Sequence, residues 1–118
     1  MRNKIKQTTF NEKVWILIAK IPESKVTTYK EIAHKLRTKA YRAVGNACNK
    51  NPNSAWALEG RVLRRKHGFI PCHRVVSSSG NIKGYAHGVK KKIEILRREN
   101  VFVKNDKIVD FEKKLHRF

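Results

Sequence analysis

The stretch Thr28-Tyr-Lys-Glu-Ile-Ala-His-Lys-Leu-Arg-Thr-Lys-Ala-Tyr-Arg-Ala-Val-Gly-Asn-Ala-Cys-Asn49 contains two short helical patterns on either side of a tight turn. The first pattern opens with Thr28 and Glu31 at the spacing of a capping box. Its apolar residues then fall on one helix face: Tyr29, Ile32, Ala33 and Leu36. The second pattern turns a row of small residues inward: Ala40, Ala43, Val44 and Ala47. Two helices across such a turn predict a helix-turn-helix.

A further helix is predicted before this stretch. Thr9 and Glu12 have capping-box spacing, and apolar residues then recur at helical intervals from Phe10 to Ile21. Pro22 should stop this helix, because proline cannot donate the backbone hydrogen bond that a helix interior needs.

The second half of the chain alternates between irregular and regular patterns. The sequence predicts a basic surface segment at residues 53–69. It then predicts a short turn leading into an extended run at residues 70–76 and a loop at residues 77–81. A last helix is marked by Val89, Ile93 and Leu96 and should end near Glu99. Residues 101–109 suggest a hairpin. The expected fold is α+β and mostly helical: a helix-turn-helix domain of winged-helix type with a short strand or hairpin.

The charge balance points to a polyanionic partner. The chain has 28 Lys and Arg against 9 Asp and Glu, a formal net charge of +19. Nucleic acid rewards such an excess through phosphate neutralisation and counterion release. A membrane surface would favour a basic amphipathic helix with a wide apolar face, which the sequence does not contain. The alternative for the charge alone is a lysine-rich surface without a specific partner.

Other features of the sequence suggest an intracellular, metal-free protein. The first seven residues lack the apolar run of a signal peptide, and no stretch approaches the roughly 20 apolar residues that cross a bilayer. Cys and His do not recur at zinc-finger spacing. The two cysteines stand in unlike contexts, which favours a reducing compartment. We therefore expect a cytoplasmic, nucleoid-associated location in a prokaryote or a nuclear one in a eukaryote, with no bound metal.

Cys72 is the candidate nucleophile. In Pro71-Cys72-His73-Arg74 a thiol stands beside a base and a cation, and both favour the thiolate form. Neighbouring residues on an extended chain point to opposite sides, so His73 is expected to act on the sulfur through a water. Alone, this pattern leaves open that the Cys-His pair is incidental.

The wider sequence resembles the DNA-binding domain of the O6-alkylguanine-DNA alkyltransferases. Residues 70–76, Ile-Pro-Cys-His-Arg-Val-Val, are similar to the active-site signature of that family. Further family-like pieces occur in the same order over about residues 8–103: Phe10-Asn-Glu-Lys-Val-Trp15, Ile21-Pro22, Val26-Thr-Thr-Tyr29-Lys-Glu-Ile-Ala33, Arg42-Ala-Val-Gly45-Asn-Ala47, Asn51-Pro52, Gly84-Tyr85 and Leu96-Arg-Arg-Glu99.

The resemblance implies a set of catalytic residues. Cys72 would accept the alkyl group, His73 would activate it through a water, and Glu99 would orient the imidazole. Glu99 also lies at i+3 from Leu96 and i+7 from Lys92, so its carboxylate shares the inward stripe of the last helix and should need a partner there. Tyr29 resembles the tyrosine that donates a proton to the leaving guanine. The alternatives are a solvated Glu99 and a Tyr29 that only fills the core.

The resemblance also implies a DNA-binding face and a base pocket. Arg42 would enter the minor groove and fill the space of an extruded nucleotide, because the reactive oxygen otherwise lies inside the base stack. Gly45 would allow close approach, and Asn46 would bond to phosphate or sugar. The other residues assigned to DNA are Ala43 and Thr28. The residues assigned to the pocket are Tyr85, Gly84, Asn51 and Val75. Cys48 is expected to be a small buried hydrophobe.

One departure concerns spacing. In the family a short apolar linker joins the asparagine-proline step to the catalytic cysteine, whereas here residues 52–71 separate Asn51 from Cys72 and include Trp56, Leu58 and a basic cluster. The family's N-terminal domain also has no counterpart in residues 1–118.

We therefore expect one alkyltransferase domain, residues 1–118, acting as a monomer without a cofactor on double-stranded DNA that contains O6-alkylguanine. Transfer to Cys72 would be irreversible. One alternative is a damage-binding module like the alkyltransferase-like proteins, which lack the cysteine. Another is a helix-turn-helix regulator that reads base edges in the major groove.

Overall fold

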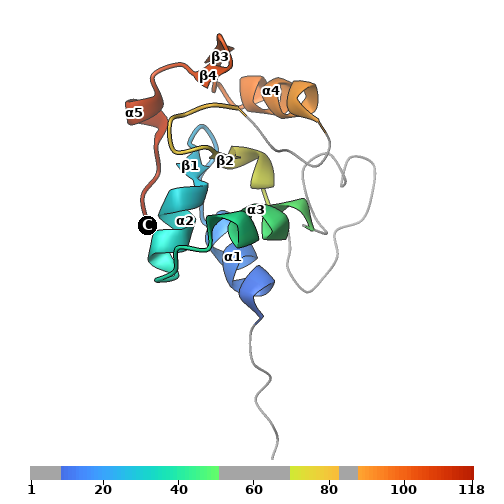
Figure 1. Cartoon of the computed structure of the whole chain (residues 1–118). Helices are drawn as coiled ribbons and strands as arrows, with labels where there is room; N and C mark the ends of the chain where they lie inside the picture. Colours follow the sequence, from blue (N-terminus) through green and yellow to red (C-terminus); the bar gives the residue numbers. More distant parts are fainter. Residues whose placement is uncertain (1–8, 51–69, 83–87) are drawn as a thin grey trace, which may run out of the picture.

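The computed structural model describes residues 9–50, 70–82 and 88–118. Figure 1 shows the first three helices together at one end, a small sheet in the middle, and the fourth helix with a hairpin at the other end. This mixed, mostly helical architecture with small sheets confirms the α+β, mostly helical part of the predicted fold class. The elements in chain order are α1 (Phe10–Ile18), β1 (Thr27–Thr28), α2 (Tyr29–Lys35), α3 (Tyr41–Asn49), the 3-10 turn η1 (Cys72–Arg74), β2 (Val75–Val76), α4 (Val89–Arg98), β3 (Val103–Lys104), β4 (Lys107–Ile108) and α5 (Phe111–Lys114).

Helix α1 begins where the sequence predicts and ends earlier. The Thr9–Glu12 capping box is complete. The helix ends at Ile18 because the next turn tightens: the amides of Lys20 and Ile21 donate to carbonyls three residues back, at 3.0 Å each. Ile21 precedes a proline, which disfavours helical backbone at that residue. The predicted extension to Ile21 is therefore wrong, although Ile21 is buried.

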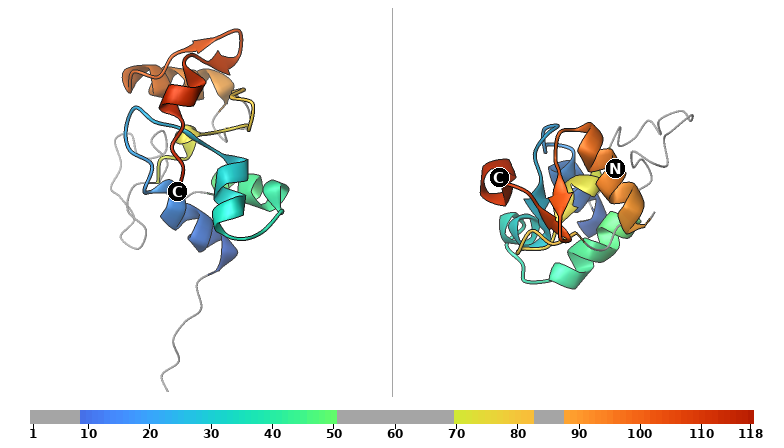
Figure 2. Two further views of the ribbon diagram at one scale, coloured as in Figure 1. Left: turned by 90° about the vertical axis from the view of Figure 1, so that its left-hand side faces the viewer. Right: turned by 90° about the horizontal axis from the view of Figure 1, so that it is seen from above.

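Two apolar clusters form the core. The larger one lies among α1, α2 and α3 and includes both cysteines, while the smaller one lies under α4 and the hairpin. The two views in Figure 2 show α4 and the hairpin stacked on the three-helix group. The indole of Trp15 ties α1 to α3 by donating to the Ala47 carbonyl at 2.8 Å. Burial of these side chains is the main force that holds the elements together.

The parallel strands β1 and β2 bring two distant parts of the chain together. Thr27 pairs with Val75 and Thr28 with Val76. Because the strands run in the same direction, the chain leaves both at the same edge of the pair. Tyr29, the first residue of α2, and Ser77, the residue after β2, are thus brought to one edge.

Two helices differ in detail from the predicted faces. In α3 the buried residues are Val44, Ala47 and Cys48, whereas Ala40 is the exposed N-cap residue rather than a core residue. In α4 the inward stripe is Lys92, Ile95, Leu96 and, just beyond the helix, Glu99. Val89 is 40% exposed because it lies in the first turn, at the end of the helix.

The C-terminal region contains the predicted hairpin and more. Strands β3 and β4 pair antiparallel across Asn105 and Asp106, whose φ angles of 51° and 63° suit a tight left-handed turn. Helix α5 follows and was not predicted. Beyond it, Leu115 forms a parallel bridge with Val26, next to β1. Within the described residues, we find no helix long and apolar enough to span a membrane.

Candidate functional site

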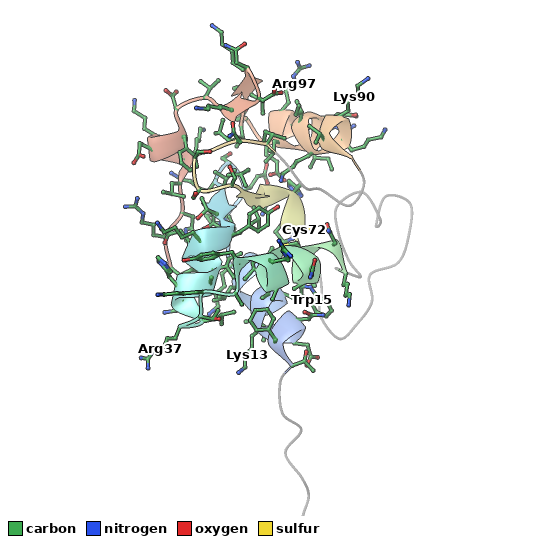
Figure 3. The ribbon with its side chains drawn as sticks, viewed as in Figure 1. Lys13, Trp15, Arg37, Cys72, Lys90 and Arg97 are labelled. Carbon is green, nitrogen blue, oxygen red and sulfur yellow. The ribbon has the colours of Figure 1, made fainter. Side chains whose placement is uncertain are left out.

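Cys72 lies at the first position of the 3-10 turn η1 and is 4% exposed. The turn forms because the Arg74 amide donates to the Pro71 carbonyl at 2.9 Å. The predicted short turn leading into an extended run is confirmed, but the turn includes Cys72 and His73, so the extended backbone assumed at these two residues is wrong. Figure 3 shows Cys72 inside the molecule, where η1 meets α3. Cys72 and Cys48, a residue of α3, belong to the same buried cluster, so the prediction of a buried Cys48 is confirmed.

His73, Glu99 and Arg74 form one buried network. The His73 Nε2 lies 3.0 Å from Glu99 Oε1, which is the contact expected for a glutamate that orients the imidazole. Arg74 binds the same carboxylate with two hydrogen bonds, of 2.9 and 2.6 Å, and donates a third, of 2.9 Å, to the Ile21 carbonyl. Arg74 was expected to be a cation beside the thiol. Instead its charge is paired with Glu99.

Protonation states follow from this network. Burial alone would raise the pKa of Glu99, but hydrogen bonds from Arg74 and His73 outweigh it and hold this pKa at about 2. Burial lowers the pKa of His73, against the opposing effect of Glu99. A neutral imidazole beside an ionised carboxylate donates its Nε2 hydrogen to that carboxylate. Nδ1 is then the basic atom of the ring.

Lys92 and Tyr29 complete the electrostatic environment of Cys72. Lys92 is fully buried and donates from Nζ to the Val75 carbonyl at 2.7 Å. Burial lowers the pKa of Lys92 to about 8, against an opposing electrostatic effect of Cys48 and Cys72. Burial, with the same two thiols, raises the pKa of Tyr29, which keeps the phenol protonated. Sequence reasoning missed Lys92, although its place on the inward stripe with Leu96 and Glu99 was a signal.

Two adjoining cavities of about 410 Å³ each open beside Tyr29. They share Tyr29, Tyr41 and Ser77. One extends along α3 and is also lined by Arg42, Gly45, Asn46 and Asn49. The other is also lined by Lys30 and Ser78. The structure thus brings Tyr29 together with the expected face of α3, and Tyr29 both packs on the core and lines the cavities. Tyr41 and Ser77 were not predicted as site residues.

The remaining candidates divide into three groups. Thr28 is 3% exposed, and its hydroxyl caps α2 by accepting from the Glu31 amide at 3.0 Å. Val75 is fully buried in β2, and Ala43 is half-buried on α3. Asn51, Gly84 and Tyr85, together with Trp56 and Leu58, lie outside the described residues. In residues 9–50, 70–82 and 88–118, no three His, Cys, Asp or Glu side chains gather as metal ligands would.

The network predicts a loss of stability in acid. The Glu99 pKa is depressed in the folded chain, so its contribution is present above about pH 4.5 and is lost as the pH falls towards about 2. The lowered His73 pKa acts in the same direction below about pH 6.5, because the unfolded chain takes up that proton first. We expect urea midpoints that fall steadily from pH 7 to pH 3.

Glu99→Gln provides the comparison for this prediction. The variant leaves the buried Arg74 without its carboxylate, which should destabilise the fold at pH 7 by roughly 3–5 kcal/mol. Its midpoint should then change less than that of the parent between pH 5 and pH 3. Parallel curves for the two proteins would show that another carboxylate governs acid unfolding.

Comparisons with known proteins identify the family of this chain. A family model described as "6-O-methylguanine DNA methyltransferase, DNA binding domain" matches residues 9–101. A methylated-DNA–protein-cysteine methyltransferase of Candida glabrata is 41% identical over 101 residues, which make up 85% of this chain and 42% of that protein. The crystal structure of Mycobacterium tuberculosis OGT in complex with DNA is 32% identical, with a TM-score of 0.65, and the match covers 82% of this chain and 52% of that one.

A fourth comparison concerns the fold alone. The structure of Schizosaccharomyces pombe ATL in complex with DNA has a TM-score of 0.68 at 22% identity and covers 97% of this chain and 100% of that one. The chain spans about half the length of the curated relatives it matches, 42% of one and 51% of another.

Proposed function

The chain belongs to the 6-O-methylguanine DNA methyltransferase family, and from this we propose that it repairs alkylated DNA by moving an alkyl group from the O6 atom of guanine to Cys72. One observation carries the proposal: a buried cysteine is next in the chain to the histidine of an imidazole–carboxylate pair and belongs to the core cluster against which Tyr29 packs, and Tyr29 lines the cavities on the α3 face. Residues 1–118 act as one DNA-binding and catalytic unit, a monomer that needs no cofactor.

The transfer is a displacement at carbon. A water passes the Cys72 proton to His73 Nδ1, and the negative charge of Glu99 stabilises the imidazolium that forms. Lys92 stabilises the thiolate electrostatically. The sulfur then attacks the alkyl carbon, the carbon–O6 bond breaks, and its electron pair stays with the purine. Tyr29 donates a proton to that purine, so that neutral guanine leaves. The new carbon–sulfur bond is not reversed, so each molecule reacts once.

The proposed DNA interface is the face beside the cavities, whose linings include Arg42 and Lys30. We propose that α2 and α3 act as a helix-turn-helix, with Arg42, Gly45 and Asn46 exposed or half-exposed along α3. Cys72 is 4% exposed, so a guanine inside a base stack cannot reach it. The guanine is therefore extruded from duplex DNA. The alkyltransferase-like alternative fits less well, because those proteins lack the cysteine that this chain places in the site.

Mass spectrometry tests this function directly. After incubation with a duplex that contains O6-methylguanine, the protein should gain one methyl group, and peptide mapping should place it on Cys72. With excess duplex the yield should stop at one equivalent, because nothing regenerates the thiol. A second equivalent, or lesion binding with no mass change, would contradict the proposal.

Gly45 gives a separate prediction about the DNA face. A Cβ added at this position would meet no atom within 4 Å, so Gly45→Ala should fold and gain about 0.5–1 kcal/mol of helix stability. The same methyl group would keep DNA from approaching α3. We expect repair of duplex DNA to slow by about tenfold, or about 1.4 kcal/mol, in single-turnover assays. Reaction with free O6-alkylguanine is the internal control and should not change.

A further inference from the structure

The C-terminal segment, residues 103–118, contacts two parts of the chain that form the walls of the candidate site, on the side away from the cavities. It lies outside residues 9–101, which match the family model. Figure 1 shows it forming the hairpin and α5 and then returning past β1 to end beside α2. The two walls it reaches are the loop after β2, which carries Ser77 and Ser78, and β1, which leads into Tyr29.

The loop wall is held by the hairpin and α5. The Ile82 amide donates to the Asp106 carbonyl, and the Ile108 amide donates to the Gly80 carbonyl, both at 2.9 Å. Gly80 has a φ of 86°, and a Cβ there would lie 3.0 Å from the Phe111 ring. Phe111 thus packs directly on the loop backbone and leaves it little freedom to move.

The Tyr29 wall is held by the last residues. The Val26 amide donates to the Lys114 carbonyl at 2.9 Å, and the His116 amide donates to the Val26 carbonyl at 2.6 Å. The Thr27 hydroxyl donates to the His116 carbonyl at 2.8 Å. This pairing adds the tail beside β1, on which β2 pairs as well. Phe118 packs against the same core cluster as Tyr29.

From these contacts we infer that residues 103–118 are a positioning element for proton donation by Tyr29. The inference rests on the proposed function. Thr27 and Thr28 precede Tyr29 directly, and the Thr28 side chain caps the helix that Tyr29 begins. A displacement of β1 therefore displaces the phenol. Proton donation needs hydrogen-bond distance to the leaving purine, so a small displacement of the donor has a large kinetic effect.

The experiment uses the full chain and free bases, so that DNA affinity plays no part. Thr27→Val keeps the shape of the side chain and removes its bond to His116. His116→Pro removes the amide donor to Val26. Arg117→Gln is the matched control, because it loses only an exposed contact of 3.7 Å with Glu31. Tyr29→Phe is the benchmark for lost proton donation.

The dependence of the transfer rate on the leaving group distinguishes a displaced Tyr29 from a general loss of protein stability. O6-benzyl-8-bromoguanine releases a more stable purine anion than O6-benzylguanine, so its reaction needs the proton less. Relative to wild type, Tyr29→Phe and the two tail variants should slow the reaction with O6-benzylguanine by about tenfold more than the reaction with the bromo compound. For the tail variants, this factor corresponds to a displacement of the phenol by a sizeable fraction of an ångström. Arg117→Gln should change both rates equally. Thermal unfolding is measured in parallel.

The possible outcomes are distinct. Equal slowing of both substrates by Thr27→Val and His116→Pro would make the tail a stabilising element and overturn the inference, as would a Tyr29→Phe variant without leaving-group dependence. If His116→Pro does not fold, the conservative Thr27→Val decides alone. A wild-type chain that does not alkylate Cys72 contradicts the proposed function instead.

Discussion

Replacement of Cys72 by alanine is expected to abolish alkyl transfer completely and to leave duplex affinity within about twofold of wild type, far below the 1.4 kcal/mol of a tenfold change. The sulfur is the only atom of this residue that can accept the alkyl group, so no partial activity should remain. Affinity depends on other residues, because phosphate contacts come from lysine and arginine side chains, of which the chain has 28, and not from a buried thiol.

Cys48→Ala is the matched control for this prediction. It removes the other buried thiol of the same core cluster and should leave transfer at one equivalent. The measurement combines intact-mass analysis of both variants after exposure to methylated duplex with fluorescence anisotropy on the same DNA. Methyl uptake by Cys72→Ala would place the acceptor elsewhere, with Cys48 as the first residue to examine.

The extent to which the sequence predicts this molecule depends on how local each signal is. The capping residues of α1 and α2 and the hairpin turn act within a few residues, and they appear where expected. The end of α1 was predicted too late in the chain, because Pro22 disfavours helical backbone at the residue before it and the preceding turn is tightened. Helical spacing also predicted that Glu99 would be buried, since it shares a stripe with Leu96.

The partners across the core were not predictable. Periodicity shows that Glu99 needs a counter-charge but not that Arg74, 25 residues away in the chain, supplies two of its hydrogen bonds. Lys92 looks like one more surface lysine until the packing of α4 places it fully inside. The pairing of Leu115 beside β1 is a contact between distant segments, with no local pattern to mark it. Long-range contacts thus determine the charges near Cys72, through Arg74 and Lys92, and the segment that pairs beside β1.

Arg42→Ala should separate base extrusion from chemistry. Arg42 is exposed on α3 and lines the cavity that Tyr29 shares. On the proposed function it fills the space of the extruded nucleotide, a step that costs a few kcal/mol in a paired duplex and little for a free base. The variant should slow duplex repair by about ten- to a hundredfold, which corresponds to about 1.4 to 3 kcal/mol. Its reaction with free O6-alkylguanine should hardly change.

Arg97→Ala is the control for Arg42→Ala, because it removes the same charge from α4, where Figure 3 shows the side chain directed away from α3. Single-turnover transfer on duplex and free base, with duplex affinity measured across salt concentrations, distinguishes the roles. An arginine that only contacts phosphate would weaken binding to damaged and undamaged DNA alike and lower the salt slope by about one contact. Equal slowing on free base and duplex would instead make Arg42 part of the pocket, since a free base requires no extrusion.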